Sequence, residues 1–107
     1  MKVIILAGGL GTRLTEYTKT IPKPMVKVAG YPLILHIMRH YLKYGYKKFY
    51  IAAGYKGYVI KRYFKKYKKD GQLFKHKIFN KNCEIAIVNT GLNTLTGGRL
   101  KRLENFI

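Results

Sequence analysis

The stretch Met1-Lys-Val-Ile-Ile-Leu-Ala-Gly-Gly-Leu-Gly-Thr-Arg13 decides the fold of this chain. Val3 to Ala7 form a short unbroken apolar run, which is typical of a central parallel strand that is covered on both faces. The three glycines that follow allow a tight turn whose backbone can approach a ligand closely. Amide N–H groups in such a turn, together with the Arg13 guanidinium, can donate hydrogen bonds to the oxygens of an anion such as phosphate. The stretch therefore predicts a strand that leads into a phosphate-binding loop, and Lys23 supplies a second, mobile charge.

Length and composition predict a single domain over residues 1–107 without a membrane span. Apolar residues make up 48% of the chain, but no run approaches the length of a membrane helix. The N-terminus lacks the basic region and long apolar stretch of a secretion signal. Cys83 is the single cysteine, so an internal disulfide is excluded and a reducing, cytoplasmic location is expected.

The charge balance is strongly basic, with 22 Lys+Arg against 4 Asp+Glu and a formal net charge of +18. One interpretation is that this surface attracts nucleotides or nucleic acid. The other, which we favour for most of the lysines, is a lysine-biased composition with solvated faces such as Lys65-Lys66-Tyr67-Lys68-Lys69. Tyrosines among the cations keep RNA binding as an alternative, since aromatic rings can stack on bases.

Hydrophobic spacing predicts alternating strands and helices after the glycine loop. Helical spacing over 33–44 predicts a buried stripe of Leu33, Ile34, Ile37, Met38, Tyr41 and Leu42. The other expected elements are core strands at 48–53 and 83–88, a helix at 55–64, an ambiguous edge strand at 74–79 and a final helix at 97–106. This order is typical of a parallel α/β sheet, whose ligands bind beyond the carboxyl ends of the strands.

Three segments are therefore expected to meet at one edge of the sheet: 8–13, 54–55 and 89–99. The four acids of the chain, Glu16, Asp70, Glu84 and Glu104, are not expected at a strand end that faces the loop. His36 and His40 are four residues apart on one helix and are expected to pack or to face solvent. A metal pair is the alternative, although no third ligand is evident.

The string Leu6-Ala-Gly-Gly-Leu-Gly-Thr-Arg-Leu14, with Pro22-Lys-Pro-Met25 behind it, resembles the signature of the sugar-1-phosphate nucleotidyltransferases. It differs from the dinucleotide fingerprint, in which Gly-x-Gly-x-x-Gly opens a helix. Three further stretches resemble the glucose-1-phosphate cytidylyltransferases: His36-Ile-Met38, Gly54-Tyr-Lys-Gly-Tyr-Val-Ile-Lys61 and Thr96-Gly-Gly-Arg-Leu-Lys-Arg102. The resemblance covers the whole chain, but only the N-terminal part of such an enzyme. It implies a Rossmann-like nucleotidyltransferase fold, the N-terminal portion of a GT-A-like domain, and the single domain is incomplete relative to that family.

The resemblance also implies a reaction and roles for particular residues. CTP and glucose 1-phosphate would give CDP-glucose and pyrophosphate with Mg²⁺ as cofactor, a step of nucleotide-sugar biosynthesis. Arg13 and Lys23 would be catalytic, steadying and neutralising the phosphates. The nucleotide would contact Leu6, Ala7, Gly8, Gly9, Leu10, Gly11, Thr12, Thr94 and Arg99.

The sequence departs from the family pattern in ways that leave its activity open. Asn89 stands where the relatives usually have aspartate, the segment 65–83 looks shorter than theirs, and their magnesium-binding aspartates and most sugar contacts follow the point at which this chain stops. The leading hypothesis is thus a truncated cytidylyltransferase with a nucleotide half-site. A non-catalytic module that binds nucleotide or RNA is the alternative. A third hypothesis is that a homo-oligomer or a complementing chain supplies the missing half through an exposed sheet edge.

Overall fold

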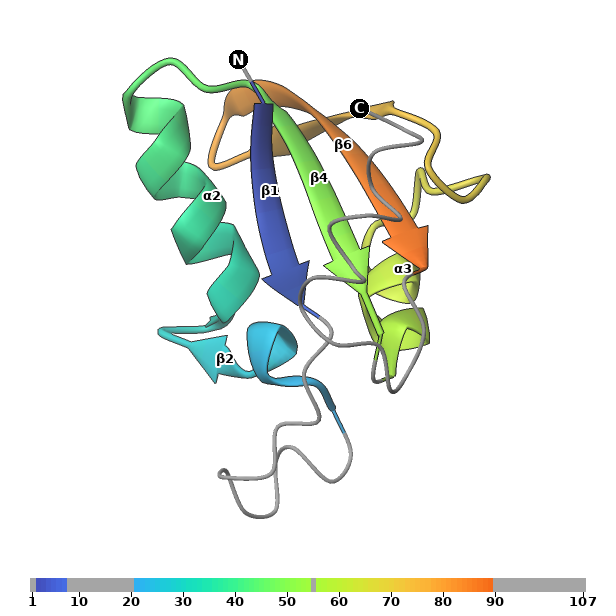
Figure 1. Cartoon of the computed structure of the whole chain (residues 1–107). Coiled ribbons are helices and arrows are strands. Elements are labelled where there is room, and N and C mark those ends of the chain that lie inside the picture. The colour runs from blue at the N-terminus through green and yellow to red at the C-terminus, as the bar shows by residue number, and fades with distance from the viewer. Residues whose placement is uncertain (1, 8–20, 55, 90–107) are drawn as a thin grey trace.

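The computed structural model describes residues 2–7, 21–54 and 56–89, which form a four-stranded sheet, a small two-stranded sheet and helices (Figure 1). In chain order the elements are β1 (Lys2–Ala7), the 3-10 helix η1 (Lys23–Met25), β2 (Lys27–Val28), β3 (Tyr31–Pro32), α2 (Leu33–Lys43), β4 (Lys48–Ala53), α3 (Gly57–Tyr63), β5 (Phe74–Ile78) and β6 (Lys81–Asn89). No helix in these ranges is long and apolar enough to cross a membrane. The final helix expected at 97–106 lies outside the described residues.

The main sheet has the order β1-β4-β6-β5. β1, β4 and β6 run parallel, and β5 is an antiparallel edge strand beside β6. The expected core strands at 48–53 and 83–88 are confirmed, and so is the edge strand that the sequence left ambiguous. The expected parallel α/β architecture is therefore confirmed for β1, β4 and β6, and β5 adds an antiparallel edge.

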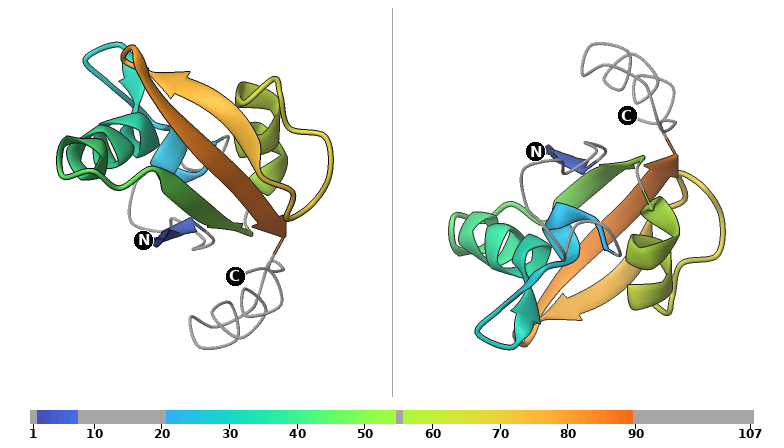
Figure 2. Two further views of the ribbon diagram at one scale, coloured as in Figure 1. Left: turned by 90° about the horizontal axis from the view of Figure 1, so that it is seen from above. Right: turned by 90° about the horizontal axis from the view of Figure 1, so that it is seen from below.

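One face of the sheet carries the larger core. Phe49, Ile51, Ile85 and Ile87 from the central strands are fully buried there against α2, η1 and α3. Figure 2 shows η1 between α2 and α3 from above and from below. The opposite face contributes a smaller buried cluster of Tyr50, Ala52, Ala86 and Val88. Continuous apolar runs in β4 and β6 are explained by burial on both faces.

Helix α2 matches the predicted helix, but its buried side differs from the predicted stripe. Ile34, Met38 and Leu42 are buried as expected, whereas Tyr41 is 37% exposed and Leu35 is buried in addition. Leu35 follows Ile34 on the same side of the helix and widens the apolar face beyond the i, i+4 positions. The tyrosine ring of Tyr41 instead packs edge-on against His40 and Tyr46 at the helix end.

Within the described residues strand β1 is an edge strand with one buried face, whereas its apolar run predicted a central, doubly covered strand. It alternates between exposed and buried residues, and Ile4 and Leu6 expose 39% and 42% of their surfaces. Val3, Ile5 and Ala7 point into the larger core. In this part of the chain β1 pairs only with β4.

The second predicted helix is shorter than expected, because it begins after a strained residue. The sequence predicts a helix over 55–64, whereas α3 covers Gly57–Tyr63. Lys56 immediately precedes it with φ 47° and ψ 39°, a left-handed conformation that interrupts the helical geometry.

Candidate active site at the carboxyl end of the parallel strands

The three parallel strands end at the same level. Ala7 of β1 is in register with Ala53 of β4, and Ala53 is in register with Asn89 of β6. Because the strands end side by side, the segments that follow them start at the same edge of the sheet, as the sequence predicted. The glycine loop at 8–13 and the segment 90–99 lie outside the described residues, so their own placement stays a prediction.

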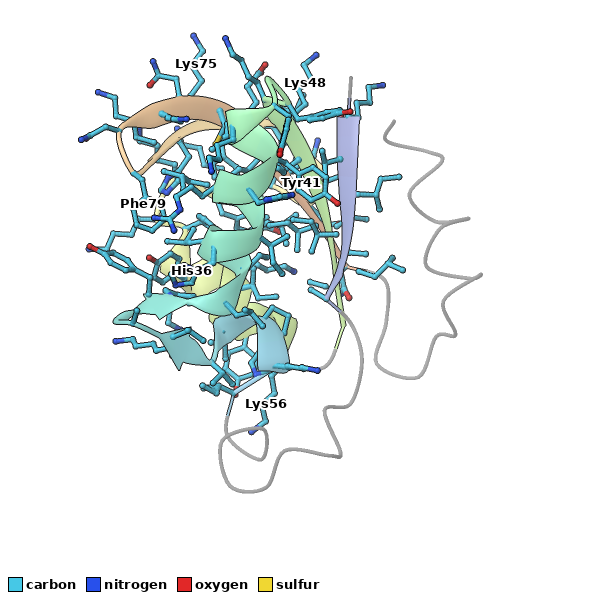
Figure 3. All side chains as sticks on the ribbon, turned by 90° about the vertical axis from the view of Figure 1, so that its left-hand side faces the viewer. His36, Tyr41, Lys48, Lys56, Lys75 and Phe79 are labelled. Carbon is cyan, nitrogen blue, oxygen red and sulfur yellow. The ribbon has the colours of Figure 1, made fainter. Side chains whose placement is uncertain are left out.

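A shallow hollow of about 410 Å³ lies where β4 and β6 end. It is lined by Ala53, Gly54, Lys56, Gly57, Tyr58, Lys61 and Asn89. Figure 3 shows Lys56 at this end of the molecule. Two ammonium groups with small neighbours make the hollow suitable for an anion, because cations on a partly shielded surface attract phosphate more strongly than they do in open water.

The backbone around this hollow is tightly constrained. A Cβ atom added to Gly57 would lie 3.0 Å from the Cβ of Ala53, closer than almost all real contacts of this kind. Gly57 therefore lets α3 start directly beside the end of β4. The left-handed Lys56 makes the turn between the two, and such strain at a non-glycine residue is often found at ligand sites.

Asp70, from the loop between α3 and β5, also lies at this end of the sheet. Its Oδ1 accepts a hydrogen bond from the Asn89 backbone N–H at 2.8 Å and lies 4.0 Å from Lys61 Nζ. The Gly71 N–H donates to the Ile87 carbonyl at 2.9 Å, so the loop between α3 and β5 folds back onto β6. The local sequence Asp70-Gly71 is typical of a turn and carries no signal for a position beside the end of β6.

Three of the predicted site residues are described. Lys23 is exposed at the start of η1, which lies at the end of the sheet where β1 finishes (Figure 1). Leu6 exposes its side chain on the face away from the larger core, whereas Ala7 is buried, so Ala7 has only backbone atoms to offer a ligand. The remaining predicted residues lie outside the described ranges: Gly8, Gly9, Leu10, Gly11, Thr12, Arg13, Thr94 and Arg99.

The described residues do not fit the Mg²⁺ that the resemblance implies. They contain no group of three or more His, Cys, Asp and Glu side chains that could hold a metal ion. Asp70 is the one carboxylate that they place at this end of the sheet, and its Oδ1 is already engaged by Asn89 and Lys61. The Nε2 of His36 donates to the Val28 carbonyl at 2.7 Å, which occupies that histidine in packing the small sheet against α2.

A mostly parallel sheet with aligned strand ends and a basic hollow beyond them defines an α/β protein of the class that binds ligands at the carboxyl ends of its strands. Solved nucleotidyltransferase structures share this fold. HddC from Yersinia pseudotuberculosis complexed with GMP-PN matches with a TM-score of 0.70 and 30% identity, over 99% of this chain and 42% of HddC. UDP-glucose pyrophosphorylase complexed with UDP-glucose matches with a TM-score of 0.73 and 24% identity, over 99% of this chain and 41% of that one.

The chain belongs to the nucleotidyl transferase family, whose model matches residues 2–97. Glucose-1-phosphate cytidylyltransferase from Salmonella typhimurium is 44% identical over 123 aligned positions, which cover 100% of this chain and 46% of the relative. The probable glucose-1-phosphate cytidylyltransferase from Bacillus subtilis is 36% identical, with the same coverage of 100% and 46%. The chain thus spans about half the length of these curated relatives and corresponds to their N-terminal part.

Proposed function

We propose that this chain carries the nucleotide-binding half of a glucose-1-phosphate cytidylyltransferase. The observation that carries the proposal is the 44% identity to that enzyme from Salmonella typhimurium across the whole of this chain. Support comes from the fold, in which β1, β4 and β6 end in register beside a hollow with two lysines. The structural match to HddC complexed with GMP-PN, at 30% identity, also supports nucleotide binding by this chain.

The proposed reaction is a substitution at the α-phosphorus of CTP. An oxygen of the glucose 1-phosphate phosphate forms a bond to that phosphorus, the bond to the bridging oxygen of the β-phosphate breaks, and pyrophosphate leaves. No covalent enzyme intermediate is needed, so positioning and charge neutralisation supply the catalysis. The family resemblance implies that Mg²⁺ assists this charge neutralisation when bound.

The residues of this chain would bind and orient the triphosphate. In the proposal Arg13 and Lys23 neutralise phosphate oxygens, and the glycine loop of residues 8–12 offers backbone N–H groups to them. Lys56 and Lys61 line the adjoining hollow and add positive charge at the end of β4. Leu6, exposed on β1, offers apolar contact.

Calorimetric titration of the chain with CTP, UTP and dTTP tests the nucleotide site. We expect CTP to bind more tightly than the other two, and we expect the affinity for CTP to fall about tenfold in Arg13→Ala or Lys23→Ala, since each removes a charged hydrogen bond worth about 1.5–3 kcal/mol. Lys43→Gln is the matched control, because Lys43 is exposed at the far end of α2. Equal affinity for the three nucleotides, or for the parent and both variants, would contradict the proposal.

Turnover is tested separately by adding glucose 1-phosphate and following pyrophosphate release in the presence of Mg²⁺. Pyrophosphate released by this chain alone would mean that it holds the complete catalytic machinery. CTP binding without release would support a nucleotide half-site that acts together with residues outside this chain.

The strongly basic composition favours a second candidate function, the binding of RNA or another polyanion. The two candidate functions are distinguished by how binding depends on salt concentration. Polyanion binding depends on counterion release and weakens steeply as salt is raised, with little preference among sequences. A pocket for CTP keeps its discrimination between bases at moderate salt.

A further inference from the structure

A groove of about 830 Å³ is lined by residues of η1, the small sheet and α3. We call it the apolar groove, and its apolar lining consists of Ile21, Met25, Val26, Pro32 and Val59. Figure 2 shows that η1 and α3 lie over the same face of the main sheet. The volume falls within the range of roughly 300–1,000 Å³ that is usual for sites of small ligands. The apolar groove shares no lining residue with the hollow of the candidate active site.

The walls of the apolar groove are held by packing and by the backbone. Met25 is only 6% exposed and belongs to the larger core, against which Val59 of α3 also packs. The Leu33 N–H donates to the Val26 carbonyl at 2.9 Å, which ties the start of α2 to the segment after η1. The apolar groove is therefore built by several packed elements and does not depend on one flexible side chain.

Three exposed cations reach the apolar groove from both of its walls. Lys27 lies opposite Pro32 in the β2–β3 pair, so both side chains lie on the same face of the small sheet. Arg62 follows Val59 by three residues on α3, so these two side chains share one side of the helix. Lys65 comes from the segment directly after α3. The cations thus accompany apolar residues on the same surfaces.

This positive charge is not balanced by a carboxylate. None of the residues described as lining the apolar groove is acidic. Asp70 forms its ion pair with Lys61, which lines the hollow of the candidate active site. The Arg62 guanidinium lies 5.3 Å over the Tyr58 ring, a contact that is weak at an exposed site and that a phosphate can replace. Charge of one sign beside apolar surface attracts an anion.

Tyr63 adds a hydroxyl donor to the apolar groove. It follows Val59 by four residues on α3 and is 38% exposed. Burial, and then the Tyr31 phenol, raise the pKa of Tyr63 above its ordinary value. The hydroxyl therefore keeps its proton at neutral pH and can donate a hydrogen bond to an anion.

Charge and size restrict what the apolar groove can bind. A second copy of the chain is disfavoured, because each copy carries a net charge of +18. A stable protein interface uses roughly 20–30 residues on each side, far more than line this groove. A fully polar anion would leave the apolar lining in contact with water, whereas a neutral apolar molecule would leave the cations without a partner.

An apolar body that carries a phosphate satisfies both parts of the lining. Three cations and a hydroxyl offer more donors than the two oxygens of a carboxylate can use, whereas a phosphate monoester offers three oxygens and up to two negative charges. Arginine and lysine both bind phosphate oxygens through charge-assisted hydrogen bonds.

We propose that the apolar groove is a binding site for a small amphiphilic phosphate monoester, taken up as a single molecule from solution. Its apolar body lies on the apolar lining, and its phosphate contacts Lys27, Arg62 and Lys65. The inference goes beyond the proposed function and does not rest on it, because the apolar groove and the hollow have no residue in common.

The test is a titration of the ¹⁵N-labelled chain with octyl phosphate below its micelle concentration, followed by NMR. Amide signals of Val26, Val59 and Tyr63 report on the apolar groove, whereas those of Gly54 and Gly57 report on the candidate active site. We expect saturable shifts at the first group. Inorganic phosphate and 1-octanol are each expected to bind at least about tenfold more weakly, because each makes only part of the contacts.

A pair of double variants separates the rim from the overall charge. In Lys27→Gln/Lys65→Gln we expect the dissociation constant of octyl phosphate to rise about tenfold or more, since two charged hydrogen bonds are lost. The control Lys43→Gln/Lys77→Gln removes the same charge from exposed positions on α2 and β5, and we expect a change below about threefold.

The apolar lining is tested by Val59→Thr, which keeps the shape of the side chain and adds a hydroxyl. We expect this variant to weaken octyl phosphate and 1-octanol alike, by about threefold or more. Circular dichroism confirms that the variants fold. Octyl phosphate is expected to raise the unfolding temperature of the parent chain, because a ligand that binds the folded state stabilises it.

Several outcomes would overturn the proposal. Absence of shifts at the apolar groove, shifts at Gly54 and Gly57 alone, or unfolding of the chain by octyl phosphate would each refute the site. An equal loss of affinity in both double variants would show attraction to the overall charge alone. Binding to vesicles of phosphatidylglycerol without binding of free octyl phosphate would assign this surface to a membrane.

Discussion

Asp70 binds the backbone of Asn89 across 19 positions of the sequence, with its Oδ1 accepting the Asn89 N–H at 2.8 Å. The hydrogen bond joins the loop after α3 to the last residue of β6, where the parallel strands end. It therefore fixes one wall of the hollow that also holds Lys61.

Replacing Asp70 by alanine is expected to lower the free energy of unfolding by about 1–2 kcal/mol, because a backbone N–H at a strand end loses a charged acceptor. Urea denaturation followed by circular dichroism measures the change. Lys61→Gln is the control, since an ion pair of 4.0 Å between partly exposed groups contributes within about 0.5 kcal/mol. A larger loss in Lys61→Gln than in Asp70→Ala would show that the ion pair, not the hydrogen bond, holds the loop.

The left-handed backbone of Lys56 predicts a difference between two substitutions at that position. Glycine adopts φ 47° without strain, so Lys56→Gly is expected to be about 1 kcal/mol more stable than Lys56→Ala. Both variants remove the ammonium group, and under the proposed function both weaken CTP binding to the same extent. Thermal unfolding and calorimetry measure the two effects, and equal stability of the variants would mean that the strain is absent in solution.

The lowered pKa of His76 predicts how stability changes in mild acid. Burial and then Lys66 lower this pKa below the ordinary 6.5, so the folded state binds fewer protons than the unfolded state once the pH falls below about 6.5. Stability contributed by the neutral imidazole is present above that pH and declines as the pH falls. Urea denaturation between pH 7 and pH 5 is expected to show a shallower decline in His76→Gln than in the parent chain.

Burial, and then Glu84, raise the pKa of the Cys83 thiol to about 11. The folded state therefore keeps the thiol proton to a higher pH than the unfolded state, so stability is lost as the pH rises from about 9 towards 11. Because the thiolate is the reactive form, iodoacetamide is expected to label Cys83 slowly in the folded chain at pH 9 and rapidly in urea. Comparable rates in both conditions would show that Cys83 is accessible in the native state.

The sequence alone was sufficient for elements whose signals are local. The apolar run at 48–53 and the helical spacing over 33–44 correspond to β4 and α2, because burial selects those patterns directly. The motif from Gly8 to Arg13 indicated the class of protein through residue type and spacing. Its glycines let the backbone approach a phosphate closely, and its arginine supplies a positive charge. The roles of those residues remain predictions.

The β5–β6 hairpin was ambiguous because its turn lacks the usual residues. Phe79 and Asn80 have φ 47° and 67°, the signs of a type I′ turn, in which asparagine and glycine are preferred and phenylalanine is not. Tertiary contacts hold Phe79 there: its ring packs 4.9 Å from the Tyr31 ring, and the Arg39 guanidinium lies 4.7 Å over it. Phe79 lies beside α2, as Figure 3 shows.

The position of Asp70 at the candidate active site also depends on contacts between residues that are distant in sequence. Asp70 reaches the end of β6 only because the loop folds back through the Gly71 to Ile87 hydrogen bond, and no local pattern encodes that return. The edge position of β1 depends in the same way on which strands pair with it.

The strand order has a consequence for the time course of folding. The antiparallel pair is closed by a two-residue turn, from Ile78 to Lys81, and such hairpins form in microseconds. The parallel pairs are closed over far longer loops, from Ile5 to Ile51 and from Ile51 to Ile87, and each closure costs chain entropy before any contact rewards it. We therefore expect the β5–β6 hairpin to form before the aligned strand ends of the candidate active site.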